Sequence, residues 1–161
     1  YIKAYKATGC NGVVMAEPLA GMLSPNLCAE FSAPYVKEIV DAVQDEEFIV
    51  VYHNCGNNIN LMTDSIFSCG AMAYHFGNAV DMEKDIIPNI PADTVVMGNI
   101  DPAGTLRLGT TEKVREETLA LLERCSKYPN FVLSTGCDVP PMTPWENIDA
   151  FFAASDEYYG K

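Results

Sequence analysis

His53 and Cys55, two residues with the chemistry of metal ligands, stand two positions apart at the end of a predicted strand, residues 48–54. Alternate residues of a strand point to the same side, so the imidazole and the thiol are expected to project together. Cys137 ends another predicted strand, residues 131–137. One imidazole and two thiolates form a ligand set well suited to zinc, and three protein ligands leave a fourth position open.

An open fourth position predicts activation of a sulfur nucleophile. Two thiolates and a neutral imidazole cancel the charge of Zn²⁺, so a substrate thiol bound there would lose its proton at neutral pH and keep electron density on sulfur. The pattern therefore favours alkyl transfer to a thiol. The other four cysteines lie at predicted helix ends or on helical faces and are expected to be small buried hydrophobes rather than disulfide partners: Cys10, Cys28, Cys69 and Cys125.

Five apolar segments are predicted to be the strands that position these ligands. Most are continuous apolar runs, which indicate strands covered on both faces, as in parallel sheets. The five predicted strands are residues 12–18, 48–54, 71–77, 94–100 and 131–137. Amphipathic helical stretches lie between them, so the predicted order is β-α-β-α throughout a single domain, residues 1–161.

Helix signals support this order. Ser24 and Pro25 indicate an N-cap followed by proline at the first helical position, and Thr143 with Glu146 forms a capping-box pattern. In the helix at residues 111–127, the predicted buried stripe is Val114, Thr118, Leu121, Leu122 and Cys125. In the last helix, the predicted stripe is Trp145, Ile148, Phe152, Ser155 and Tyr159.

Parallel strands joined by helical crossovers leave two architectures, an open doubly wound sheet or a (β/α)8 barrel. The segment after the first strand has no glycine-rich phosphate loop, so no nucleotide is expected. In both architectures the carboxyl ends of the strands share one rim, which also receives Glu17, His75, Asn99 and Asp101. Glu17 and Asp101 could be catalytic or could cap turns, and His75 could be a ligand or a hydrogen-bonded core histidine.

The charge balance excludes some partners. Ten Lys and Arg against 22 Asp and Glu give a formal charge of −12 over 161 residues, and the basic residues are scattered. This balance disfavours nucleic acid and anionic membranes as partners. No apolar run approaches the length of a membrane span, and no signal-peptide pattern is present. These features predict a cytoplasmic protein.

Three groups of residues form a recognisable set: the segments 53–57 (HNCGN), 98–102 (GNIDP) with 109–114 (GTTEKV), and 134–140 (STGCDVP) with 143–148 (TPWENI). Together they resemble the uroporphyrinogen decarboxylase superfamily. Within this superfamily they look most like the zinc-dependent methyltransferases that act on methylated corrinoid proteins. The resemblance covers nearly the whole chain in the right order.

The resemblance implies a TIM-type (β/α)8 barrel, of which this chain matches about the last five βα units. It implies zinc held by His53, Cys55 and Cys137, with His75 or Glu17 as the open alternatives for a fourth ligand. It also implies methyl transfer from methylcobalamin, carried on a corrinoid partner protein, to a small thiol such as coenzyme M. Glu17, Asn99 and Asp101 are the predicted catalytic residues at the rim.

Two other interpretations remain. One is a decarboxylase without metal, which would bind a porphyrinogen polycarboxylate through arginines, although only Arg107 is placed to reach the rim. The other is an inactive fragment with a structural zinc site. Five units of a barrel would expose two sheet edges, so we expect the chain to lack an N-terminal half or to pair with another chain as a homo-oligomer.

Overall fold

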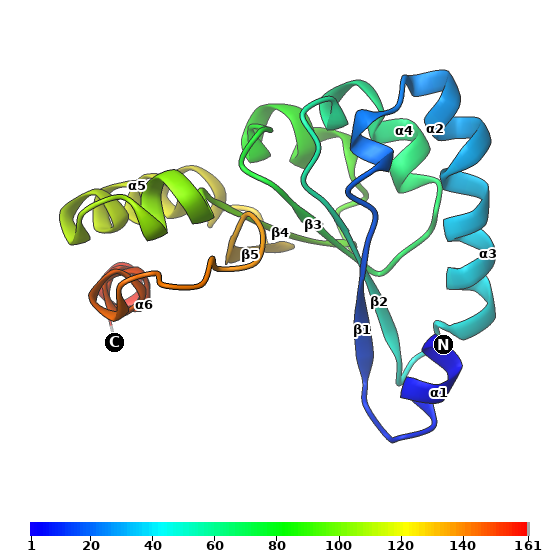
Figure 1. Cartoon of the computed structure of the whole chain (residues 1–161), viewed down its shortest axis with the longest axis horizontal. Coiled ribbons are helices and arrows are strands. Elements are labelled where there is room, and N and C mark those ends of the chain that lie inside the picture. The colour runs from blue at the N-terminus through cyan, green and yellow to red at the C-terminus, as the bar shows by residue number, and fades with distance from the viewer. Residues whose placement is uncertain (161) are drawn as a thin grey trace.

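The computed structural model describes residues 1–160 and contains one sheet of five parallel strands (Figure 1). The strands are β1 (Gly12–Ala16), β2 (Ile49–Asn54), β3 (Ala73–Phe76), β4 (Val95–Ile100) and β5 (Phe131–Thr135). They lie side by side in chain order, and each neighbouring pair is parallel. This confirms the five predicted parallel strands. A doubly wound sheet reverses its strand order part-way, whereas this order advances in one direction, as in a barrel.

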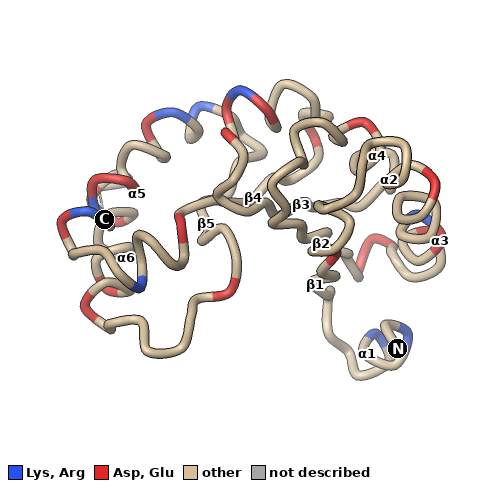
Figure 2. The backbone as a smooth tube through the Cα atoms, turned by 45° about the horizontal axis from the view of Figure 1, so that its top comes forward, with Lys and Arg blue, Asp and Glu red and all other residues tan. Residues whose placement is uncertain are grey.

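Helices and short helical turns connect the strands and follow the outer side of an arch (Figure 2). The α-helices are α1 (Ile2–Lys6), α2 (Pro25–Phe31), α3 (Ala33–Val43), α4 (Thr63–Phe67), α5 (Thr111–Cys125) and α6 (Trp145–Tyr159). The short turns are Ala20–Met22, Ile59–Leu61 and Ile87–Asn89, of 3-10 type, and Met82–Ile86 and Pro102–Arg107, of π type. Within residues 1–160, no helix has the length and apolar character needed to cross a bilayer.

The connection between β3 and β4 departs from the predicted alternation because it contains short turns in place of an α-helix. Asp81 caps the first turn by accepting hydrogen bonds from the backbone N–H groups of Glu83 and Lys84. Pro88 and Pro91 follow, and each removes a backbone donor that a longer helix would need. The chain therefore returns to the sheet without forming an α-helix.

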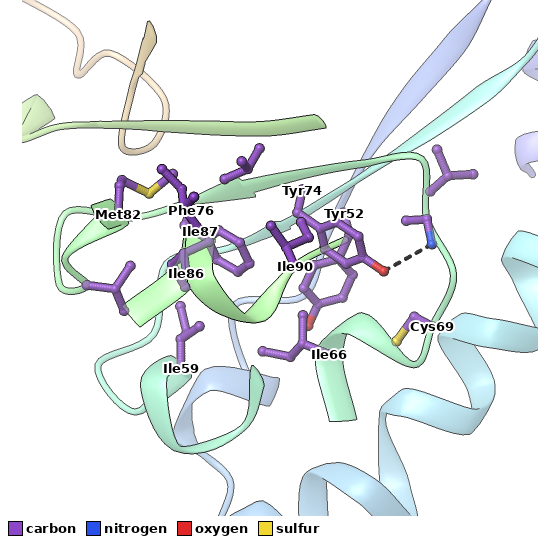
Figure 3. Packing of buried hydrophobic residues seen from close by; sticks show 14 of the residues in the cluster. Tyr52, Ile59, Ile66, Cys69, Tyr74, Phe76, Met82, Ile86, Ile87 and Ile90 are labelled. Atoms are coloured by element: carbon purple, nitrogen blue, oxygen red, sulfur yellow. Dashed lines mark hydrogen bonds between the residues drawn. The ribbon is translucent and has the colours of Figure 1, made fainter. Parts of the chain in front are cut away.

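The main core lies between the sheet and the surrounding helices and turns (Figure 3). Tyr52 of β2 and Tyr74 and Phe76 of β3 are fully buried there, because alternate strand residues point to the same side. Tyr74 places its hydroxyl between two backbone groups: it accepts a hydrogen bond from Ala71 N–H and donates one to the carbonyl oxygen of Phe67. These aromatic side chains fix β2 and β3 against the outer layer.

The opposite, concave face of the sheet is open. Val14 on β1 is 66% exposed, and Val132 on β5 is 41% exposed. A hollow of about 840 Å³ lies over the amino-terminal half of the face, beside Val51, Ala73 and Met97. Within residues 1–160, β1 and β5 each pair with a single strand. The fold is therefore a partial TIM barrel of five consecutive parallel strands, with both sheet edges exposed as expected.

The helix predictions are confirmed for α5 and partly wrong for α6. The predicted stripe of α5 is buried along its whole length, and Ser24 caps α2 by accepting a hydrogen bond from Leu27 N–H. In α6 the N-cap is Pro144, and the Thr143 hydroxyl donates to the carbonyl oxygen of Pro140 instead of capping the helix.

The buried face of α6 is also not the predicted one. Asn147, Phe151 and Ala154 are buried, whereas Trp145 and Phe152, from the predicted stripe, are 76% and 62% exposed. The Asn147 amide explains the orientation, because it donates hydrogen bonds to the carbonyl oxygens of Leu106 and Gly109. A buried amide needs such partners, so this contact turns the aromatic stripe outward.

Candidate metal centre

The predicted ligands His53, Cys55 and Cys137 come together at the carboxyl end of the sheet. The Sγ atom of Cys137 lies 3.5 Å from Nε2 of His53 and 3.9 Å from Sγ of Cys55. The candidate ligand atoms of all three residues lie within 4.8 Å of one another, and no other group of this kind occurs within residues 1–160. His53 is buried, and the two cysteines are half-buried.

The two distances from the Cys137 sulfur fit a tetrahedral zinc ion. Zn–S bonds of about 2.3 Å and Zn–N bonds of about 2.0 to 2.1 Å place two sulfur ligands about 3.8 Å apart, and a sulfur and a nitrogen about 3.6 Å apart. The observed separations are 3.9 Å between the sulfurs and 3.5 Å between Cys137 Sγ and His53 Nε2. These three residues therefore could bind a metal ion such as zinc.

Glycines at the strand ends let distant ligands approach. The strands β3 and β4 lie between β2, which precedes Cys55, and β5, which precedes Cys137. A Cβ atom on Gly77, directly after β3, would lie 2.7 Å from Cα and Cβ of Cys55. A Cβ atom on Gly136 would lie 2.8 Å from the backbone nitrogen of Asn78. The loop after β3 is therefore packed between the two cysteine loops, backbone against backbone.

Gly77 and Gly136 were not identified from the sequence as the residues that allow this close backbone packing. The available signal was the placement of glycine immediately after a predicted strand or beside a candidate ligand, since glycine permits a close approach of two backbones. Gly56, next to Cys55, has the same function on the other side: its Cβ atom would lie 2.3 Å from Cα of Gly21 in the loop after β1.

The imidazole of His53 is held in the form that binds metals. Its Nδ1 lies 3.2 Å from the carbonyl oxygen of His75, and a carbonyl oxygen only accepts, so Nδ1 carries the proton and donates it. The lone pair on Nε2 is then directed at Cys137. Burial and the neighbouring His75 hold the pKa of His53 below its ordinary value, so the ring is neutral at neutral pH.

The thiol of Cys55 is also held in its neutral form. Burial and the adjacent Cys137 raise the pKa of Cys55 above its ordinary value. Without a cation the thiolate form is therefore disfavoured, and a bound metal ion would supply the compensating charge.

Neither alternative for a fourth ligand joins the cluster. His75 directs Nε2 toward the carbonyl oxygen of Thr135, at 2.6 Å, so that nitrogen must carry a proton and has no lone pair for a metal. Glu17 accepts a hydrogen bond from the Ser32 hydroxyl at 2.9 Å. The three-residue set thus leaves a coordination position without a protein ligand in this arrangement.

Asn99 and Asp101 lie near the same rim but are engaged with the backbone. The Asn99 amide donates to the carbonyl oxygens of Gly77 and Val80, which fixes the loop after β3. The carboxylate of Asp101 accepts hydrogen bonds from two backbone N–H groups, those of Ala103 and Gly104, and so caps the turn after β4. A catalytic role for Glu17, Asn99 or Asp101 stays a prediction.

The remaining cysteines differ from the site cysteines. Cys28, Cys69 and Cys125 are buried, as expected of small hydrophobes, and Cys10 is half-buried. Burial raises the pKa of Cys69 to about 12 and that of Cys125 to about 11. Such thiols stay protonated at neutral pH and are poor metal ligands.

A family model and two known proteins match nearly the whole chain. Residues 1–158 match the family described as uroporphyrinogen decarboxylase (URO-D). The chain is 30% identical to methylcobamide:CoM methyltransferase MtaA of Methanosarcina barkeri, over 99% of this chain and 45% of the relative. It is 31% identical to a uroporphyrinogen decarboxylase of Synechococcus sp., over 96% of this chain and 43% of the relative.

A solved structure described as a methyltransferase from Methanosarcina mazei has a similar fold. Its TM-score is 0.84 at 28% sequence identity, and the match covers 97% of this chain and 44% of that one. The chain therefore spans less than half the length of the relatives it matches.

Proposed function

Because this chain belongs to the uroporphyrinogen decarboxylase family, we propose that it is the metal-holding part of a zinc-dependent methyltransferase. The proposed reaction moves a methyl group from a methylated corrinoid protein to a small thiol such as coenzyme M. The observation that carries the proposal is the position of the Cys137 sulfur, whose distances to the Cys55 sulfur and to Nε2 of His53 match those around a tetrahedral zinc ion. The similarity to a methylcobamide:CoM methyltransferase supports the choice of reaction.

The chain's own residues would prepare the site for a thiol. His53, Cys55 and Cys137 would hold zinc, which supplies a Lewis acid that lowers the pKa of a bound thiol. The protonated Nε2 of His75 and the hydrogen-bonded Glu17 leave the remaining position to the substrate. Asn99 would keep the ligand spacing constant, because it fixes the loop that is packed between the two cysteines.

The surface around the site suits a protein partner. Exposed apolar side chains stand on the loops that follow the strands, at the end of the barrel that carries the ligands. Five of them are Leu19, Met22, Leu61, Leu108 and Met142. Exposed apolar side chains after several neighbouring strands can form an interaction surface, and we propose that the corrinoid protein binds there.

A decarboxylase without metal is the competing function, and the decarboxylase relatives keep it open. Binding of a polycarboxylate would require basic side chains at the rim. Of the three arginines, Arg115 is paired with Glu157 and Arg124 with Asp81. This leaves Arg107 as the arginine near the rim, which favours the methyltransferase.

X-ray absorption spectroscopy of the zinc-loaded chain tests the proposal. We expect two sulfur ligands in the free chain and a third when coenzyme M is added. Isethionate, in which a hydroxyl replaces the thiol, is the matched control and should add no sulfur. A zinc shell that coenzyme M leaves unchanged would favour a structural zinc site and contradict the proposal.

A further inference from the structure

His75 contacts the ligand His53 and the end of the strand that precedes Cys137, but it is not itself a member of the ligand set. It lies on β3 directly beside His53 of β2, with which it is in register, and the two rings are 4.7 Å apart. Its carbonyl oxygen accepts a hydrogen bond from the Nδ1–H group of His53. Its ring is directed the other way, toward β5, where Nε2 lies 2.6 Å from the carbonyl oxygen of Thr135 and 3.2 Å from the hydroxyl oxygen of Ser134.

The ring contact crosses the sheet. The strand β4 lies between β3 and β5, so the His75 side chain joins two strands that share no backbone hydrogen bonds. Thr135 is the last residue of β5 and comes two positions before Cys137. The hydrogen bond therefore fixes the end of the strand from which Cys137 is presented.

The strand β5 needs such a tether more than the inner strands do. It pairs with β4 alone within the described chain, and none of its residues is fully buried. The strand β2, which presents His53 and Cys55, pairs on both sides and contains three consecutive buried residues, Tyr52 to Asn54. The position of Cys137 relative to His53 thus depends on contacts that cross the rim, and the His75 ring provides the shortest of them.

We infer that His75 is a positioning residue that holds Cys137 opposite His53 and Cys55. This rests on the proposed metal site but assigns His75 a role outside the ligand set. Outer hydrogen-bond partners of metal ligands typically affect metal affinity by about 10- to 100-fold. Loss of the His75 ring donor should have an effect of that size.

Two substitutions separate the hydrogen bond from the bulk of the ring. His75→Phe keeps an aromatic ring and removes the donor, whereas His75→Gln places an amide N–H at a similar reach. Tyr74→Phe is the matched control, because it removes a side-chain donor to a carbonyl oxygen from the neighbouring residue on the opposite face of the sheet. Zinc affinity would be measured by competition with a chromophoric chelator, and stability by thermal unfolding of the metal-free chain.

We expect His75→Phe to weaken zinc binding by about 10- to 100-fold and His75→Gln to restore most of the affinity. Tyr74→Phe should lower the melting temperature and leave zinc affinity unchanged. The inference is overturned if His75→Phe binds zinc like the wild type, or if zinc affinity falls in all three variants in proportion to their stability.

A second readout needs no metal. Diamide oxidises two neighbouring thiols to a disulfide by accepting their two hydrogen atoms, so it reports how closely Cys55 and Cys137 approach in the metal-free chain. Peptide mass spectrometry would identify the product. His75→Phe should slow formation of this disulfide, and an unchanged rate would overturn the inference. If the wild type forms the disulfide but binds no zinc, the proposed function fails while the role of His75 is still measured.

Discussion

Replacing Gly77 with alanine would test how far backbone packing at the strand ends sets the metal ligands. The new Cβ atom would lie 2.7 Å from both Cα and Cβ of Cys55, and ordinary contacts of this kind begin at 3.4 Å. The difference requires a displacement of about 0.7 Å between the loop after β3 and Cys55. The atoms to be moved belong to the backbone and Cβ of a ligand, so a side-chain rotation cannot relieve the contact.

The displacement is large for a metal site. Ligand distances are normally conserved to about 0.2 Å, so a shift of about 0.7 Å should weaken the site. From the effect of outer-shell changes we expect Gly77→Ala to raise the zinc dissociation constant about 10- to 100-fold, equivalent to about 1.4 to 2.8 kcal/mol. Overpacking should also lower the free energy of unfolding by about 1 to 3 kcal/mol.

Gly12→Ala separates these two effects. Its Cβ atom would lie 2.8 Å from the carbonyl oxygen of Ile49, so the crowding is similar, but Gly12 and Ile49 begin their strands at the opposite end of the sheet. We expect this variant to lose stability and to keep the zinc affinity of the wild type. Chelator competition and thermal unfolding on both variants would decide. Wild-type zinc affinity in Gly77→Ala, or an equal loss in both variants, would refute the reasoning.

Three further predictions concern other parts of the chain. Burial tends to raise the pKa of Asp81, but hydrogen bonds from the Lys84 backbone and from Arg124 outweigh it and hold the pKa below its ordinary value. The resulting stability is complete above about pH 5 and is lost as pH falls through the lower folded-state pKa. Asp81→Asn should therefore flatten the decline in melting temperature between about pH 5 and about pH 2, and an unchanged slope would contradict this. The hydroxyl of Thr118 is buried without a hydrogen-bond partner, so Thr118→Val should stabilise the chain by about 1 kcal/mol in denaturant unfolding, and a less stable variant would count against this. Trp145 is the only tryptophan and is 76% exposed, so its fluorescence should show the long emission wavelength and ready acrylamide quenching of a solvated indole; shielded emission would show that the exposed stripe of α6 is covered in solution.

The fold was largely predictable because its strands are short apolar runs that end in polar residues. The spacing of His53 and Cys55 on one strand indicated a shared direction, and parallel topology brought Cys137 to the same rim. Periodicity also identified the buried stripe of α5 correctly. These features depend on residues that are near one another in the chain or on a general rule about parallel sheets.

The features that were not predicted depend on contacts between distant segments. The stripe predicted for α6 lies on the wrong face because the sequence shows where apolar residues recur, but not that Asn147 reaches carbonyl oxygens about 40 residues earlier. His75 stayed ambiguous for the same reason: its partner Thr135 lies 60 residues further along. The close packing of Gly77 on Cys55 involves two strand ends and has no local pattern beyond the glycine itself.

Zinc content of the purified chain tests the central claim most directly. The ligand geometry predicts about one zinc ion per chain, lost in Cys137→Ser and in His53→Ala and retained in Cys10→Ser, a control at a half-buried cysteine outside the site. A wild-type chain that folds normally and takes up no zinc, or one whose zinc survives both ligand substitutions, would contradict the account.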